Sequence, residues 1–283
     1  MERRGRQRRE GAGPPEDAAS HGVCGMGPWE LGALLAGLIL GSFANVCIHR
    51  IPLEQSIVRP RSRCPRCGVP IRPWDNVPVL SYLWLLGRCR ACHARISPRY
   101  PLVEAANGFL YWAVAVTQAP GGAAGVTMLF LTALLVLSLI DLEHYILPNV
   151  ITLPGVVLGV AATFLPGWPL SPLESILSAL GGYVALAIFG MSYQKLRGVE
   201  GLGQGDWKMV AMLGAFLGWR GAVLTVLFAS VVGTLVGLAA ALWQRTSLRQ
   251  QRVPLGTFLG LAAMVVVFVG RPVMNWYWSL WNG

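Results

Sequence analysis

Four of the six cysteines form two matched pairs with the spacing of a metal site. Cys64 and Cys67 are followed, after 21 intervening residues, by Cys89 and Cys92. Four thiolates complete the tetrahedral shell of Zn²⁺, so a zinc ion held here would be structural. Two disulfides or an iron–sulfur cluster are the alternatives, and we favour zinc. His93 is either a substitute ligand or, as we expect, a solvated side chain.

Two aspartates offer a second kind of chemistry. Asp141 ends one apolar run and Asp206 begins another, 65 positions later. Two carboxylates that meet share one proton, so one can act as a base on water while the other donates to a peptide carbonyl. This chemistry cleaves a peptide without a metal. Two acids at helix ends can also be solvated caps, so the pair alone leaves both interpretations open.

Glycines and a proline flank the two aspartates. Gly203 and Gly205 precede Asp206, and Pro148 follows Asp141. Glycine lets another backbone approach closely, so an extended substrate could pair with free N–H and C=O groups here. Helix-packing contacts are the alternative role for these glycines.

Other residues near these segments have two interpretations each. Lys208 either tunes the two carboxylates electrostatically or only sets the topology. Glu104 and Glu200 could contact basic residues of a substrate, or they could cap helices. Pro254 and Gly256 place a third irregular segment near the same face.

The composition requires a membrane. Of the 283 residues, 54% are hydrophobic and 13% are charged, whereas a typical soluble domain has about 25% charged residues. Such a low charged fraction cannot cover a water-facing surface, and a disordered chain would need the opposite composition.

Apolar runs near the length of a bilayer span predict eight transmembrane helices. They cover Trp29 to Ile48, Leu102 to Thr117, Ala123 to Ile140, Val150 to Leu165, Leu173 to Tyr193, Trp207 to Leu217, Ala222 to Trp243 and Val253 to Val269. The predicted fold is an all-α polytopic membrane protein with a first helix at 29–48, a zinc-ribbon-like module at 49–101 and a helical core at 102–283. The apolar stretch 77–87 is too short to span, so we expect it to lie on the membrane surface or to pack on the bundle.

Basic residues predict the sidedness of the bundle. If the spans alternate, sixteen Lys and Arg fall on one side, ten of them in the loop 49–101, and only Arg220 and Arg271 fall near the other. The positive-inside rule then makes the zinc module and both aspartates cytoplasmic. The net charge of +10 thus reflects topology, which argues against a nucleic-acid partner, although these arginines could bind anionic lipid headgroups.

The N-terminal segment conflicts with this topology. Five arginines occur in the first ten residues and would lie outside. Either residues 1–28 are a disordered basic tail, or translation starts at Met26, which we favour. An intact-mass measurement that finds the first 25 residues in the native protein would refute the second interpretation.

The motifs together resemble the prepilin peptidases, or type IV leader peptidases, which are membrane aspartic proteases of the GxGD type. In the family's order the chain has GSFANVCIHRIP at 41–52, the CPRC and CRAC knuckles with DNVPVLSYLWL between them, ISPRYPLVE at 96–104, the segment 141–149, GLGQGDWK at 201–208, LGAFLGW at 213–219 and VPLGTFLG at 253–260. The GxGD motif alone is a weak signal, but its occurrence together with the other motifs makes the match specific. Glu143 departs from the pattern, since the family often has Asp there.

The resemblance implies removal of the short basic leader from type IV prepilins and from the pseudopilins of type II secretion, at the cytoplasmic face of a bacterial inner membrane. Asp141 and Asp206 match the two catalytic aspartates of the family. Many members with the cysteine loop also methylate the new N-terminal residue with S-adenosylmethionine, and we expect both activities because all four cysteines are present. No residue is assigned to S-adenosylmethionine.

A transporter or channel is the competing prediction, with Asp141 and Asp206 as an ion or proton relay. Transporters are often built from repeated halves. The sequence shows no such internal similarity, and the zinc loop has no obvious part in conduction.

Overall fold

The computed structural model describes residues 26–198, 202–244 and 254–282. Most of the basic N-terminal segment and Glu200 therefore lie outside the described residues. The described helices are α1 (Pro28–Arg50), the 3₁₀-helix η1 (Pro73–Asn76), α2 (Leu80–Trp84), α3 (Arg99–Thr117), α4 (Gly122–His144), α5 (Asn149–Ala162), α6 (Pro172–Arg197), α7 (Gln204–Gln244) and α8 (Leu255–Asn282).

The predicted all-α membrane architecture is confirmed. Within the described ranges, α1, α4, α6 and α7 are long and apolar enough to cross a membrane. α5 and the first part of α8 are shorter apolar helices. Their side chains leave large apolar surfaces exposed, as expected of a bundle whose solvent is lipid.

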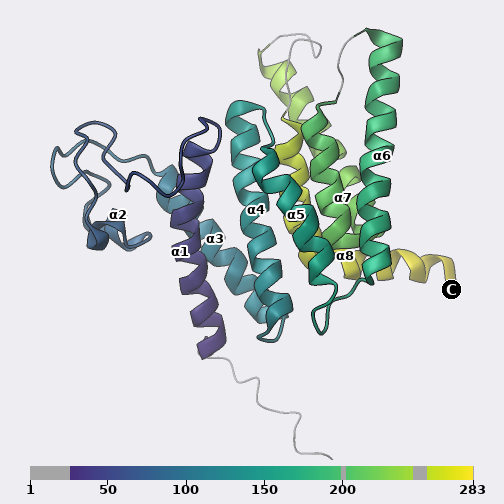
Figure 1. Ribbon diagram of the computed structural model, residues 1–283, viewed down its shortest axis with the longest axis horizontal. Helices are drawn as coiled ribbons and strands as arrows, with labels where there is room; N and C mark the ends of the chain where they lie inside the picture. Colours follow the sequence, from purple (N-terminus) through teal and green to yellow (C-terminus); the bar gives the residue numbers. More distant parts are fainter. Residues whose placement is uncertain (1–25, 199–201, 245–253, 283) are drawn as a thin grey trace, which may run out of the picture.

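α4 lies at the centre of the bundle, with α1 and α3 on one side and α5 to α8 on the other (Figure 1). Buried Asn107 of α3 joins three of these helices. Its amide donates to the Gly37 carbonyl of α1 at 2.7 Å, and its oxygen accepts from the Thr132 hydroxyl of α4 at 2.9 Å. Such pairing is needed because an unpaired polar group in hydrocarbon costs several kcal/mol.

α7 contains the predicted sixth and seventh spans, which meet at Gly218. This residue has φ 70° and ψ 177°, a region that is essentially restricted to glycine. Gly233 packs against Phe258 near the start of α8, so the second half of α7 has returned to the end from which the first half came. Both ends of α7 accordingly lie together in Figure 1. The predicted boundary between two spans is therefore a reversal of the chain.

Residues 51–98 form a separate structure beside α1, which we call the cysteine module (Figure 1). It contains η1, α2 and two isolated antiparallel bridges, Arg63 with Pro70 and Arg88 with Arg95. With so little regular structure, the module needs another source of order.

Candidate functional site

The four cysteines of the module converge on one point. Their sulfurs all lie within 4.8 Å of one another, and those of Cys64 and Cys92 are 3.8 Å apart. Thiolates arranged tetrahedrally at about 2.3 Å from a zinc ion are separated by about 3.8 Å. The residues therefore fit zinc. All four are free thiols, so the structure does not contain the alternative pair of disulfides.

The two knuckles are built by the same local turn. In the first, the Gly68 N–H donates to the Cys64 carbonyl, and in the second the His93 N–H donates to the Cys89 carbonyl. Gly68 and His93 both have left-handed backbones, with φ of 71° and 55°. His93 thus fills the turn position of its knuckle, and its exposed side chain agrees with the predicted solvated role.

Hydrogen bonds and an ion pair within the cysteine module favour metal binding and stabilise its local structure. The backbone N–H groups of Cys67 and Arg66 lower the pKa of the Cys64 thiol to about 6, whereas desolvation and the neighbouring sulfurs raise the pKa of Cys67 to about 11. Cys64 is therefore the thiol that most readily forms the thiolate that binds metals. Arg90 of the second knuckle makes a bidentate ion pair with Asp75 of η1, with Nε–Oδ2 and Nη2–Oδ1 distances of 2.9 and 2.6 Å. This pair ties η1 to the metal-binding knuckle.

Asp141 and Asp206 lie at the same end of the helical core, where the alternation of spans places them. Asp141 lies in the last turn of α4 and is only 5% exposed. Asp206 lies in the first turn of α7 and is partly buried. Leu147 packs against both Gly205, which precedes Asp206, and Gly256, which lies beside the Asp141 carboxyl group. The packing of α4, α7 and α8 therefore brings together two acids that are far apart in the chain.

Thr257 of α8 holds the Asp141 carboxylate. Its N–H donates to Asp141 Oδ2 at 2.7 Å, and its hydroxyl is 3.2 Å from the same oxygen and 2.9 Å from the Ser138 carbonyl. The N–H groups at the start of a helix have no partner within the helix, so they suit a carboxylate. The sequence did not predict Thr257 as a site residue. The signal that could have identified it is a single hydroxyl in the apolar segment VPLGTFLG.

Asp206 is held by its own segment. The Gly203 N–H donates to Asp206 Oδ2 at 3.2 Å, while the Asp206 N–H donates to the Gly203 carbonyl at 3.1 Å. Both backbone groups of Gly203 are therefore engaged at the start of α7. An extended substrate could pair with the Gly203 N–H only after its bond to Asp206 opens, whereas the carbonyl has a second lone pair to offer.

Leu147 fills the space beside the aspartates. A Cβ at Gly205 would lie 3.0 Å from the Leu147 Cβ, and a Cβ at Gly256 would lie 2.9 Å from its methyls and 3.0 Å from the Asp141 carboxyl carbon. These glycines thus allow close packing, which is one of the two predicted roles. Pro148 comes directly after Leu147 and directly before the start of α5. Leu147 itself carried no signal, because it is an ordinary apolar residue in an apolar sequence.

Three other charged residues, one each in α3, α4 and α7, have described partners. Lys208 donates to Asn149 Oδ1 at 2.9 Å, which joins the first turns of α7 and α5. Glu143 forms an ion pair with Arg99 at the start of α3. Buried Glu104 accepts the N–H of Val79 at 2.8 Å; this residue directly precedes α2, so Glu104 caps that helix, as one of its two interpretations predicted.

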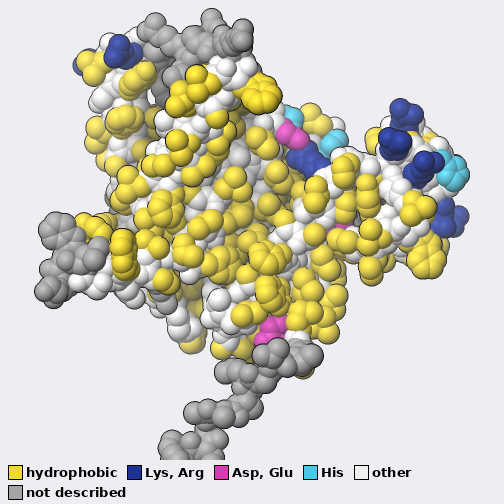
Figure 2. Space-filling model, turned by 180° about the vertical axis from the view of Figure 1, so that it is seen from behind, with side chains coloured by type: hydrophobic (Ala, Val, Ile, Leu, Met, Phe, Trp, Pro, Cys, Tyr) yellow, Lys and Arg dark blue, Asp and Glu magenta, His cyan; other side chains and the backbone are white. Residues whose placement is uncertain are grey.

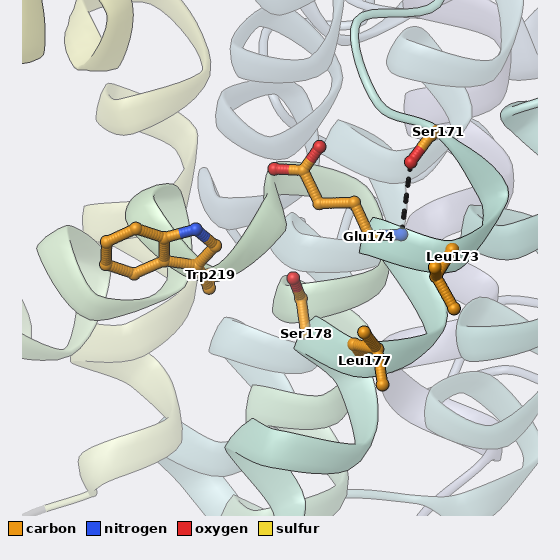
Figure 3. Close-up of a pocket in the computed structure, with 6 residues that line it drawn as sticks. All are labelled: Ser171, Leu173, Glu174, Leu177, Ser178 and Trp219. Atoms are coloured by element: carbon orange, nitrogen blue, oxygen red, sulfur yellow. Dashed lines mark hydrogen bonds between the residues drawn. The ribbon is translucent and has the colours of Figure 1, made fainter.

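A cavity of about 440 Å³ lies at the opposite end of the bundle (Figure 3). It is lined by Ser171, Leu173, Glu174, Leu177, Ser178 and Trp219. The Glu174 N–H donates to the Ser171 hydroxyl at 3.2 Å, which caps the start of α6. This cavity is therefore separate from the aspartate site.

Comparisons with known proteins identify the family to which the chain belongs. The model of the bacterial peptidase A24 N-terminal domain matches residues 35–118, and that of the type IV leader peptidase family matches residues 128–238. A prepilin leader peptidase/N-methyltransferase of Aeromonas salmonicida strain A449 is 35% identical, over 92% of this chain and 97% of the relative. Proteins of the same name from Pseudomonas aeruginosa and Pseudomonas putida are 37% and 38% identical, over 86% and 85% of this chain and 91% of each relative.

The chain belongs to the type IV leader peptidase family. The predicted resemblance is confirmed. The N-terminal model includes the cysteine module, and the leader peptidase model includes both Asp141 and Asp206. Thr257 lies beyond either match. No solved structure matched the chain.

Proposed function

We propose that this leader peptidase family member is a membrane aspartic peptidase that removes the leader from prepilins and pseudopilins, and that it also methylates the new N-terminus. The placement of Asp141 and Asp206 at one end of the bundle, in segments that both pack against Leu147, carries the proposal. The names of the relatives support both activities. Those names give no support to the alternative of an ion or proton relay.

The two aspartates would cleave the peptide as a general acid–base pair. One carboxylate takes a proton from water as the water oxygen attacks the scissile carbonyl carbon, and the other carboxyl gives its proton to the carbonyl oxygen. Collapse of the tetrahedral intermediate breaks the C–N bond, and the leaving nitrogen takes up a proton. Hydrogen bonds from Thr257 and Gly203 would keep both carboxylates in place for these steps.

The aspartates and the cysteine module would face the cytoplasm of a bacterial inner membrane. This orientation follows from the basic residues of the module and of the loops at the same end of the bundle. The basic leader of a prepilin lies on that side too, so the substrate can reach Asp141 and Asp206 without crossing the membrane.

We further propose that Cys64, Cys67, Cys89 and Cys92 hold a structural zinc ion. The ion would cross-link two knuckles that have little other order. S-adenosylmethionine would supply the transferred methyl group. We assign no residue to it and derive no step from it.

The proposal is tested by incubating the purified protein in detergent with a prepilin and S-adenosylmethionine. The parent should release the leader and methylate the product, and Asp206→Asn should cleave roughly 10²–10⁴-fold more slowly. Glu174→Gln, an equivalent change at the opposite end of the bundle, should cleave at the parent rate. Absence of leader release by the parent, or undiminished release by Asp206→Asn, would contradict the proposal.

A further inference from the structure

The cysteine module exposes a group of large apolar side chains around η1 and α2. Each is between 62 and 85% exposed. They are Trp74, Leu80, Leu83, Trp84 and Leu86. Leu83, Trp84 and Leu86 thus leave their side chains open to the surroundings, although α2 is joined to α3 through the Val79–Glu104 hydrogen bond.

The module folds back beside α1 instead of extending away from it. Glu104, which caps α2, packs against α1 so closely that a Cβ at Gly41 would lie 2.8 Å from the Glu104 Cα. Gly41 precedes Arg50, the last residue of α1, by nine positions, or about 13 Å along the helix. Figure 1 shows the same relation, with α2 level with the body of α1. α2 therefore lies alongside α1 and not beyond its C-terminal end, the placement that an interfacial helix requires.

Charge and apolar surface are separated on the module. Figure 2 shows Lys and Arg side chains on its upper and outer side and hydrophobic side chains along its lower edge, which continues toward the apolar surface of the bundle. The Arg72 guanidinium lies 5.8 Å from the centre of the Trp74 ring. Tryptophan beside arginine is typical of the boundary between headgroups and acyl chains.

We propose that the apolar face that Leu80, Leu83 and Trp84 share by their i, i+3 and i+4 spacing is inserted into the lipid interface beside α1 together with Trp74 and Leu86, with the arginines of the module at the level of anionic headgroups. Glu104 ties α2 to α3, and the Asp75–Arg90 ion pair ties η1 to the second knuckle. The inference goes beyond the proposed function and does not depend on peptidase activity.

The alternative to lipid at this apolar surface is an apolar segment of a substrate protein. A second cavity, of about 300 Å³, lies between the end of α1 and the module and is lined in part by Val58 and Ile71. Val58 is 78% exposed, as accessible as Trp84, but it faces this cavity. It is therefore a matched control for the proposed lipid contact.

Photo-crosslinking tests the inference on the full chain in nanodiscs of phosphatidylethanolamine and phosphatidylglycerol. p-Benzoylphenylalanine is placed at Leu83, at Trp84 or, as the control, at Val58, and adducts are identified by mass spectrometry. Unchanged zinc content shows that each variant retains the module. We expect lipid adducts at Leu83 and Trp84, few at Val58, and no loss of the lipid adducts when prepilin is added. Equal lipid labelling at all three positions, or prepilin adducts that replace lipid at Leu83 and Trp84, would overturn the proposal.

Amide hydrogen exchange gives a second test. The doubly substituted Leu83→Glu, Trp84→Glu protein should exchange faster than the parent over residues 77–87 in these nanodiscs, because charge does not insert into the acyl region. In detergent the difference should be smaller, and Val58→Glu should match the parent. No acceleration in the nanodiscs would contradict lipid insertion.

Discussion

The cysteine module and the aspartate site are assembled over very different distances along the chain. All four cysteines lie within residues 64–92, and both knuckles use the same hydrogen-bonded turn. The aspartate site instead needs α4, α7 and α8, and Thr257 reaches Asp141 across 116 positions. A local change can therefore disrupt the module, whereas the aspartates depend on the packing of the whole core.

The two regions also differ in what holds their polar groups. In the module, four sulfurs surround a point that suits a metal ion, and little apolar material is buried around them. At the aspartates, backbone N–H groups and a hydroxyl hold the carboxylates while Leu147 fills the space between two glycines. The first site is expected to be sensitive to metal removal and the second to small changes in shape.

The largest expected effect is that of replacing Cys64 and Cys67 by Ser, which should disturb the cysteine module and leave the packing around the aspartates in place. Removal of half of the ligands should reduce bound zinc from about one ion per chain to near zero. Hydrogen exchange should then rise across residues 51–98 and change little in α4 and α7. Metal analysis and segment-resolved exchange measure both effects.

Cys47→Ser is the control for that change, because Cys47 is buried in α1 and lies outside the cluster. It should leave the zinc content at the parent value. Retention of zinc by the Cys64, Cys67 variant would contradict the four-thiolate site.

Thr257→Val probes the long-range support of the aspartates. The change removes one hydroxyl near Asp141 but keeps the shape of the side chain and the backbone N–H. We expect kcat for leader release to fall roughly tenfold, the equivalent of one hydrogen bond to a charged group, with little change in KM. Thr257→Ser should restore most of the rate, since it keeps the hydroxyl.

Thr225→Val is the matched control for Thr257→Val. Thr225 is buried as well, but its hydroxyl donates to the Gly221 carbonyl of its own helix. This variant should cleave at the parent rate. An equal loss in both valine variants, or no rescue by serine, would show that Thr257 acts only through general packing.

Asp75→Asn should have the smallest effect, because the Arg90 ion pair that it breaks is at the surface and screened by solvent. Hydrogen exchange in η1 should rise modestly while zinc remains bound.

Arg90 holds the pKa of Asp75 below its usual value. The pair therefore contributes above the ordinary carboxyl pKa of about 3.9 and is lost only as pH falls through the lowered value, so the difference from the parent should be the same at neutral and mildly acidic pH. High salt should reduce it, and an undiminished difference there would argue against a charge effect.

The sequence predicted those features that follow from local spacing and from alternation of spans. The knuckle spacing predicted the convergence of the four cysteines, and alternation predicted that Asp141 and Asp206 share one end of the bundle. The reversal at Gly218 falls between the two predicted spans that end at Leu217 and begin at Ala222. In each case a few neighbouring residues or the bilayer thickness decide the result.

Features that depend on contacts between distant helices were not predicted. The hydrogen bonds of Thr257 and the position of Leu147 require the relative placement of α4, α7 and α8, which no local pattern encodes. The same contacts decide that Gly205 serves close packing. The catalytic roles of Asp141 and Asp206 stay a prediction.

A double-mutant cycle on leader release tests the central claim, that Asp141 and Asp206 act as one unit, most directly. Residues that work as a unit are strongly non-additive. Asp141→Asn, Asp206→Asn and the double variant should therefore share the same low residual rate while each retains the zinc content of the parent. A double variant slower than either single variant by the product of their effects, or a single variant that still cleaves at the parent rate, would contradict it.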